Sequence, residues 1–383
     1  MDLKPGYKQT EVGVLPADWE VAKLAAVCSM KSGEGITGAH IDQFSTYPCY
    51  GGNGLRGFTA RFTHDGRYAL IGRQGALCGN VLGVEGKFFA SEHAIVVTAS
   101  ARTDIRWLTF VIKKMRLNQY SESSAQPGLS VSKLLNLDLA RPPTKAEQEA
   151  IAEALSDADA LIESLEQLIA KKRHLKQGAM QELLTGKKRL PGFSGEWGIK
   201  RFGDVAQPRK ERIDPRKTGV HDFCIELEHI EQGSGCLLGS GATGDGSSLK
   251  AVFHSGDVLF GKLRAYLRKY WLADRSGICS TEIWVFLPKL SQVTPDFLFQ
   301  LVTVDRFIEA ASIAYGTHMP RSDWNLVKNY ELALPSIDEQ TAIAAILSDM
   351  DAEIAALEAR LAKARQIKQG MMYNLLTGRI RLV

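Results

Sequence analysis

The chain lacks the features that would place it in a membrane or outside the cell. No apolar run approaches the length of about 18 residues that marks a membrane-spanning helix. The first five residues, Met1 to Pro5, lack the apolar core of a signal peptide. The six cysteines stand singly, without a Cys-x-x-Cys pair, which favours reduced thiols over a disulfide framework or a zinc site. We therefore expect a cytoplasmic protein with no membrane contact.

Complete catalytic motifs are also absent. The sequence contains no G-x-x-x-x-G-K-[ST] phosphate loop, no H-E-x-x-H zinc helix and no G-x-S-x-G nucleophile elbow. The eight histidines show no metal-ligand spacing, and we expect His93 to be a core residue on a strand. These absences favour a non-catalytic chain that holds no metal or cofactor of its own.

The composition is that of an ordinary folded protein. The chain has 383 residues, of which 45% are hydrophobic and 23% are charged, so it has room for two or three domains. The formal net charge of +4 is mildly basic, which permits nucleic-acid binding without demonstrating it.

One stretch occurs twice. The first copy extends from Pro143 to Gly186, the second from Pro335 to Gly378, and more than half of the aligned positions are identical without a gap. Each copy begins with a capping box, Thr144-x-x-Glu147 or Ser336-x-x-Glu339, in which hydroxyl and carboxylate satisfy amides of the first helical turn. An internal repeat of this kind predicts two long, equivalent helices of about 38 residues, or about 57 Å each.

Both copies carry the same apolar seam. Apolar residues recur at alternating spacings of four and three, a period of about 3.5 residues that is typical of left-handed coiled-coil packing. The seam positions are Ile151, Leu155, Ala158, Ile162, Leu165 and Ile169 in the first copy, and Ile343, Leu347, Met350, Ile354, Leu357 and Leu361 in the second. Identical caps and seams within one chain favour two helices that pack on each other.

The rest of the chain forms two larger segments. Each shows short strand-like runs broken by glycine, such as Tyr68 to Ile71 and Glu282 to Phe286, and one helical stretch, Ile105 to Gln119 or Pro295 to Ala311. We divide the chain into a domain at residues 1–142, a helix at 143–189, a domain at 190–334 and a helix at 335–383.

Basic and amide side chains gather in loops of both domains. Arg, Lys, Asn and Gln are the side chains that read guanine and adenine edges in the major groove, and the cations also neutralise phosphates. The candidate DNA-binding residues are Asn53, Arg56, Arg61, Arg73, Gln74, Lys262, Arg264, Arg268, Thr317, His318 and Arg321. Composition alone leaves open that these clusters are ordinary solvated surface.

The repeated Pro-x-x-x-Glu-Gln-x-x-Ile-Ala helix that ends in Leu-Leu-Thr-Gly resembles the specificity (S) subunit of type I restriction–modification systems. Looser matches to that family span most of the chain: residues 7–13, 50–54, 70–75, 261–264 and 316–321. The resemblance implies an α+β fold with a pseudo-two-fold internal repeat. Two mixed target-recognition domains would be separated by two long antiparallel coiled-coil helices.

The same resemblance implies a division of labour in bacterial defence. Each domain would read one half of an interrupted site in double-stranded DNA, and the helices would set the gap. Two modification (methyltransferase) subunits would bring S-adenosylmethionine, and restriction subunits would bring ATP- and magnesium-dependent translocation and cleavage. The seam weakens at Lys172, Lys176 and Lys368, where we expect the helices to flare apart or to accept helices of a modification subunit.

Three alternatives remain at this point. The chain could be the recognition subunit of a two-site type II enzyme, which cuts on both sides of its target. It could be a coiled-coil adaptor for protein partners, which loss of duplex DNA binding would favour. It could be a self-contained methyltransferase, which methyl transfer by the purified chain alone would establish.

Overall fold

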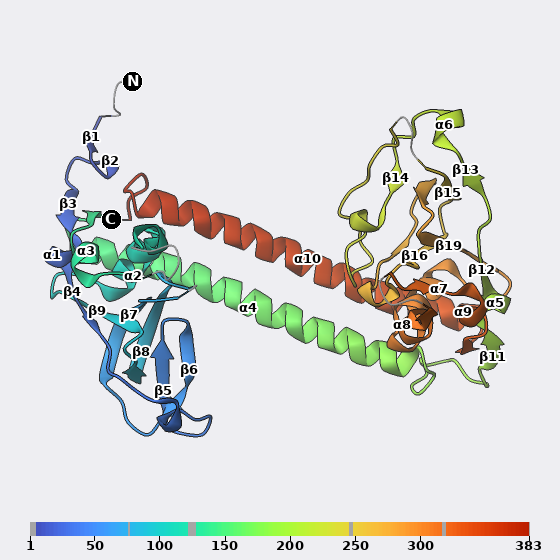
Figure 1. Cartoon of the computed structure of the whole chain (residues 1–383), viewed down its shortest axis with the longest axis horizontal. Helices are drawn as coiled ribbons and strands as arrows, with labels where there is room; N and C mark the ends of the chain where they lie inside the picture. Colours follow the sequence, from blue (N-terminus) through green and yellow to red (C-terminus); the bar gives the residue numbers. More distant parts are fainter. Residues whose placement is uncertain (1–4, 76, 122–127, 245–247, 316–318, 383) are drawn as a thin grey trace. The chain divides into compact units, whose positions relative to one another are not determined.

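The structure is a computed structural model that describes residues 5–75, 77–121, 128–244, 248–315 and 319–382. It separates into two compact units (Figure 1). Unit 1 comprises residues 1–166 and 359–383, and unit 2 comprises residues 167–358. Each unit therefore holds one mixed domain together with one part of each long helix.

In unit 1 a mixed sheet carries the domain. Its strands follow the order β4-β9-β7-β8-β5-β6, antiparallel except for the β5–β8 pair. Two small antiparallel pairs, β1–β2 and β3–β10, lie at the start and end of the domain sequence. The elements are β1 (Tyr7–Thr10), β2 (Gly13–Pro16), β3 (Glu20–Lys23), α1 (Leu24–Val27), β4 (Cys28–Ser32), β5 (Tyr47–Gly51), β6 (Gly54–Thr59), β7 (His64–Gly72), β8 (Val81–Ala90), β9 (Ala94–Ala99), α2 (Ile105–Lys114), α3 (Val131–Leu135), β10 (Asp138–Arg141) and α4 (Lys145–Leu183).

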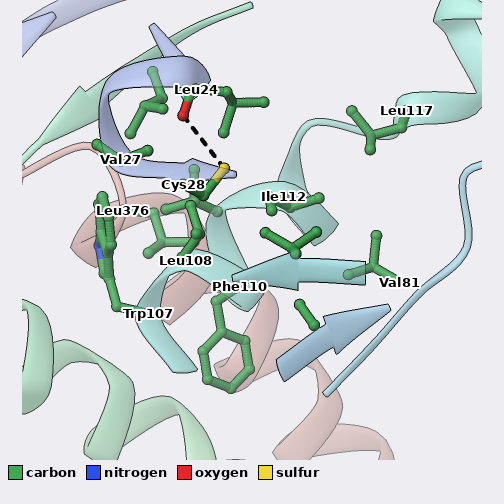
Figure 2. Close-up of a cluster of buried hydrophobic side chains, with 14 of the residues drawn as sticks. Leu24, Val27, Cys28, Val81, Trp107, Leu108, Phe110, Ile112, Leu117 and Leu376 are labelled. Carbon is green, nitrogen blue, oxygen red and sulfur yellow. Dashed lines mark hydrogen bonds between the residues drawn. The ribbon is translucent and has the colours of Figure 1, made fainter. Parts of the chain in front are cut away.

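The core of unit 1 lies between this sheet and the helices. Trp107, Leu108 and Ile112 of α2 are fully buried with Leu24 and Val27 of α1, as Figure 2 shows. Leu376, just after the last helix of the chain, is buried in the same cluster. The Cys28 thiol donates to the Leu24 carbonyl at 3.3 Å, and burial raises the pKa of this thiol to about 12. It is therefore a packing residue rather than a reactive one.

Unit 2 repeats this frame. The order β12-β19-β16-β17 matches β4-β9-β7-β8 of unit 1, and a second sheet, β13-β15-β18-β14, is added. The elements are β11 (Gly198–Arg201), α5 (Phe202–Val205), β12 (Ala206–Pro208), β13 (Arg212–Ile213), α6 (Pro215–Thr218), β14 (Cys224–Ile225), β15 (Lys250–Phe253), β16 (Val258–Gly261), β17 (Tyr270–Leu272), β18 (Gly277–Ser280), β19 (Ile283–Pro288), α7 (Pro295–Thr303), α8 (Asp305–Ser312), β20 (Ala314–Tyr315), β21 (Arg321–Ser322), α9 (Trp324–Val327), β22 (Glu331–Leu334) and α10 (Ile337–Leu375).

Of the predicted helices, one is interrupted and one ends earlier than the sequence indicates. The stretch from Pro295 to Ala311 is two helices, because Val304 is extended with φ −72° and ψ 147°. The helix from Ile105 ends at Lys114, and Arg116 then adopts a left-handed φ of 49°. In both places the apolar pattern continues past the break, so periodicity alone could not reveal it.

Within each unit, α4 and α10 pack antiparallel to each other. Each helix has 39 residues. Ile151, Leu155 and Leu165 are buried in unit 1, and Ile169, Ile343, Leu347 and Ile354 in unit 2. The remaining seam positions of the prediction are half-buried: Ala158, Ile162, Met350, Leu357 and Leu361.

Ion pairs join the two helices where the apolar seam weakens. In unit 2, Lys176 pairs with Asp351 at 2.5 Å and Lys172 with Glu353 at 2.6 Å. In unit 1, Lys368 pairs with Asp159. The expectation that the helices flare apart at these lysines is therefore wrong, because the ammonium groups reach carboxylates on the facing helix.

The Glu-Gln pair at the start of each long helix fastens it to its domain. The hydroxyl halves of the predicted capping boxes are present, since Thr144 and Ser336 accept bonds from the Glu147 and Glu339 amides at 3.2 and 3.3 Å. The neighbouring Gln148 accepts from the amide of Asp104, the N-cap of α2, and Gln340 accepts from the amide of Thr294, the N-cap of α7.

The two glutamates themselves bind arginines from the end of the other repeat. Arg189 donates to both carboxylate oxygens of Glu339 at 2.6 and 2.7 Å. Arg381 binds Glu147 and also Asp18, at 2.9 and 3.0 Å, and holds the pKa of Asp18 below its usual value. Each guanidinium group also lies over a tryptophan ring, Trp197 or Trp19. Trp19 and Trp197 therefore occupy equivalent positions in the two units.

Candidate nucleic-acid interface

One end of the unit 1 sheet is built from the loops that follow β4, β5, β7 and β8. The Arg73 amide, after β7, donates to the His93 carbonyl at 2.9 Å, and the Leu129 amide donates to the Arg73 carbonyl at 3.0 Å. The Ser91 amide, after β8, donates to the Tyr50 carbonyl at 2.8 Å. Backbone bonds therefore hold these loops against one another.

Glycine is required where two of these loops touch. A Cβ on Gly72 would lie 2.4 Å from the Gly52 carbonyl oxygen and 2.7 Å from that of Leu77. Real Cβ atoms do not approach backbone so closely, so any side chain here would force the loops apart. Gly52 and Gly72 therefore allow the two loops to approach closely, which brings Asn53 and Arg73 to the same end of the sheet.

The predicted residues of unit 1 lie at or beside this end. Asn53 and Arg56, on the β5–β6 hairpin, are exposed, as is Gln74. Arg73 is half-buried and donates to the Ser32 hydroxyl at 2.9 Å. Arg61 pairs with Glu34 at 3.3 Å, and its guanidinium lies 4.8 Å from the centre of the Phe89 ring.

Unit 2 repeats the same backbone bonds with other side chains. The Lys262 amide, after β16, donates to the Glu282 carbonyl at 3.0 Å, and the Ser322 amide donates to the Lys262 carbonyl at 2.8 Å. Lys262 thus stands where unit 1 has Arg73, and Glu282 stands where it has His93. Three predicted residues lie together at this end: Lys262, Arg264 and Arg321. The Arg264 amide donates a hydrogen bond to the Pro320 carbonyl, which joins the two segments.

The residue two positions after Arg73 or Lys262 has a left-handed backbone in both units. Gly75 has a φ of 84°, whereas its counterpart Arg264 has a φ of 55°. A non-glycine residue in this region costs about 1–2 kcal/mol. Unit 2 therefore keeps an exposed arginine where glycine would relieve backbone strain.

Arg268 lies apart from this group. It also has a left-handed φ, of 51°, and it binds Asp305 at the start of α8. Together with Lys176 and Gln181 of α4 it lines a cavity of about 600 Å³ within unit 2. Two further predicted residues, Thr317 and His318, lie outside the described residues.

Sequence reasoning missed three side chains at these sheet ends: Glu92, His93 and Glu282. The prediction that His93 is a core residue is wrong. It lies in the turn before β9, its side chain is 48% exposed, and its ring is 3.2 Å from the Glu92 carboxylate. The strand begins one residue later than the apolar pattern suggests. The polar sequence Ser91-Glu92-His93 is the feature that indicates a turn before it.

The described residues contain no group of three or more His, Cys, Asp or Glu side chains that could hold a metal ion. In the same part of the chain, no helix combines the length and apolar character that crossing a bilayer requires. The predicted residues at the sheet ends have basic or amide side chains, and the carboxylates of Glu92 and Glu282 lie among them.

Comparison with known proteins identifies the fold. A solved type I restriction–modification S subunit from M. genitalium has the same fold, with a TM-score of 0.66, 15% identity and 98% of each chain covered. A second solved chain, from a study of complex assembly and conformational transition of the type I R-M system, gives a TM-score of 0.52 at 15% identity, covering 96% of this chain and 99% of that one. The fold is thus that of a specificity subunit.

The sequence carries the same relationship. The family model described as the type I restriction modification DNA specificity domain matches residues 16–171 and again residues 195–366. The chain therefore belongs to the type I restriction–modification DNA specificity subunits, and it has two target-recognition domains and a non-catalytic role.

Two curated Escherichia coli relatives differ in how much they share. The EcoprrI specificity subunit is 43% identical over 146 residues, which cover 37% of this chain and 36% of that subunit. The EcoDI specificity subunit is 22% identical over an alignment of 414 residues, which covers 96% of this chain and 90% of that subunit.

Proposed function

We propose that each target-recognition domain reads one half of a bipartite site in double-stranded DNA, and that the paired helices set the spacer between the halves. The observation that carries this proposal is the equivalence of the two sheet ends. Arg73 and Lys262 sit in identical backbone bonding, on loops whose other side chains differ between the units. One frame with two different sets of basic and amide side chains suits two different half-sites.

The catalytic steps in this proposal belong to other chains. Two modification subunits with S-adenosylmethionine would methylate an adenine in each half-site, and restriction subunits would use ATP and magnesium. The solved relative from a study of type I complex assembly supports such a multi-subunit arrangement. We also propose the division at residues 1–142, 143–189, 190–334 and 335–383, and the positions of α4 and α10 inside the two helical segments support it.

Methylome sequencing of cells with and without this chain tests the proposal. We expect a methylated two-part sequence with a fixed spacer that disappears when the chain is removed. Methylation of a single undivided sequence would contradict the two-domain reading. A lack of any chain-dependent methylation, in cells that contain the modification subunits, would contradict the function itself.

Replacing Arg264 by glycine separates recognition from stability. The variant should be as stable as the parent or more stable by about 1 kcal/mol, because the left-handed backbone is relieved. If Arg264 reads a base, discrimination at one position of one half-site should fall by about 1–3 kcal/mol. Methylation rates on a library with that half-site randomised, together with thermal unfolding, measure both effects.

The matched control is Arg116→Gly, since Arg116 is an exposed arginine in unit 1 with a φ of 49°. This variant should gain the same stability without any change in recognition. An equal loss on all sequences for Arg264→Gly would make Arg264 a phosphate contact. No loss would remove it from the interface.

A further inference from the structure

The sheet end of unit 2 contains an ion pair that has no counterpart at the equivalent described positions of unit 1. Arg321 Nε donates to Glu282 Oε2 at 2.8 Å, and this bond raises the pKa of the guanidinium. The Arg321 side chain is 49% exposed and the Glu282 side chain 28%. The more accessible member of the pair is therefore the arginine.

Both backbones of the pair are held in place. Glu282 accepts from the Lys262 amide through its carbonyl, and its own amide donates to the Ser280 hydroxyl at 3.4 Å. Arg321 forms a bridge to Leu263, and the next residue, Ser322, is buried and donates its hydroxyl to the Ala311 carbonyl. The guanidinium group and the carboxylate that orients it thus both extend from backbone held by hydrogen bonds, as a site that depends on geometry requires.

The equivalent positions in unit 1 carry different chemistry. Leu263 bridges Arg321 in unit 2, whereas Gln74 bridges Gly128 in unit 1. His93 takes the place of Glu282. The pair therefore belongs to the part of the surface in which the two recognition domains differ, rather than to the shared frame.

The carboxylate decides what the arginine is suited to bind. A phosphate contact depends on net positive charge, and Glu282 offsets that charge and repels phosphate. A guanine edge presents the O6 and N7 acceptors, which a correctly oriented guanidinium meets with two parallel N–H donors. Arg carries five such N–H donors, and the bond to Glu282 uses the one on Nε. The two terminal amino groups supply the remaining four.

We propose that Arg321 reads a guanine in the half-site of the second recognition domain, and that Glu282 is its positioning residue. This inference rests on the proposed function of that domain. It assigns one base and separates two roles, since Arg321 touches the base and Glu282 acts through Arg321.

Variants of the full chain, expressed in place of the parent with the rest of the system unchanged, test this assignment. Arg321→Ala should lower the discrimination for guanine at one position of one half-site by about 5- to 150-fold. Arg321→Lys should show a similar loss, because lysine keeps the charge and lacks the planar fork. Glu282→Ala should relax the same position by a smaller factor, and the double variant should be no worse than Arg321→Ala.

Methylation rates on a library randomised in both half-sites give the readout, and the half-site of the first domain reports that the chain is folded and active. Relaxation at a different position in Glu282→Ala would mean that Glu282 contacts a base itself, and would overturn its positioning role. A uniform loss on all sequences for Arg321→Ala would make it a phosphate contact. Unchanged recognition in both single variants would overturn the inference alone. A parent chain that directs no two-part methylation would instead overturn the proposed function.

Discussion

Inserting one heptad at the same level of both long helices is expected to lengthen the spacer of the recognised DNA by about 3 base pairs. Seven residues add about 10.5 Å of helix, and each base pair occupies about 3.4 Å of duplex. The insertions belong between Leu165 and Ile169 in α4 and between Leu357 and Leu361 in α10, which are equivalent places in the repeat. The seam continues unbroken because its period is preserved.

The half-site sequences themselves should not change, since the insertions leave both recognition domains intact. Modification mapping on a library with randomised spacer lengths measures the new gap. The control is a four-residue insertion in α4 alone, which adds about one turn and breaks the register of the seam. That control should weaken recognition without defining a new spacer. An unchanged spacer in a folded, active paired variant would show that another part of the complex measures the distance.

Replacing Arg381 by alanine is expected to destabilise unit 1 by about 3–5 kcal/mol. The Glu147 side chain is 1% exposed and binds this guanidinium, so the variant leaves a buried carboxylate without its cation. For a unit of this size the thermal midpoint should fall by on the order of 10 °C. Thermal unfolding followed by circular dichroism measures the shift.

A second change at the same site tests the cause. Adding Glu147→Gln to Arg381→Ala removes the stranded charge, so the double variant should be more stable than Arg381→Ala alone. The matched variant in the other repeat is Arg189→Ala, which strands Glu339 and should destabilise unit 2. Its effect should be smaller, because Arg381 also binds Asp18. A double variant less stable than Arg381→Ala would assign the loss to packing against Trp19.

The repeated helices were the most predictable part of the fold. Their caps and seam are local patterns, and the hydroxyl bonds of Thr144 and Ser336 follow from four consecutive residues. The guanidinium partners of Glu147 and Glu339 could not be predicted in this way. Arg381 and Arg189 come from the ends of the other repeat, and no spacing rule connects residues that meet only after folding.

The basic side chains at the sheet ends could be predicted from the sequence, but their contacts with one another could not. Glycine-bounded loops with basic side chains located Arg73, Lys262 and Arg264. The turn that holds His93 was misread because strand ends carry a weak apolar signal. The positioning role that we propose for Glu282 could not be predicted, because only the structure shows its bond to Arg321.

The ion pairs between α4 and α10 do not by themselves determine which helix each one pairs with. Asp159 and Lys176 occupy one helix, and their counterparts Asp351 and Lys368 occupy the other, with each acid bound to the lysine of the facing helix. Two copies of α4 from separate molecules would satisfy the same pairs, so the charges do not distinguish self from partner. Intramolecular pairing prevails because one chain holds both helices at a high effective concentration. A fragment that ends after α4 would keep the complementary charges and lose that advantage, so it could complete its seam with a second copy of itself.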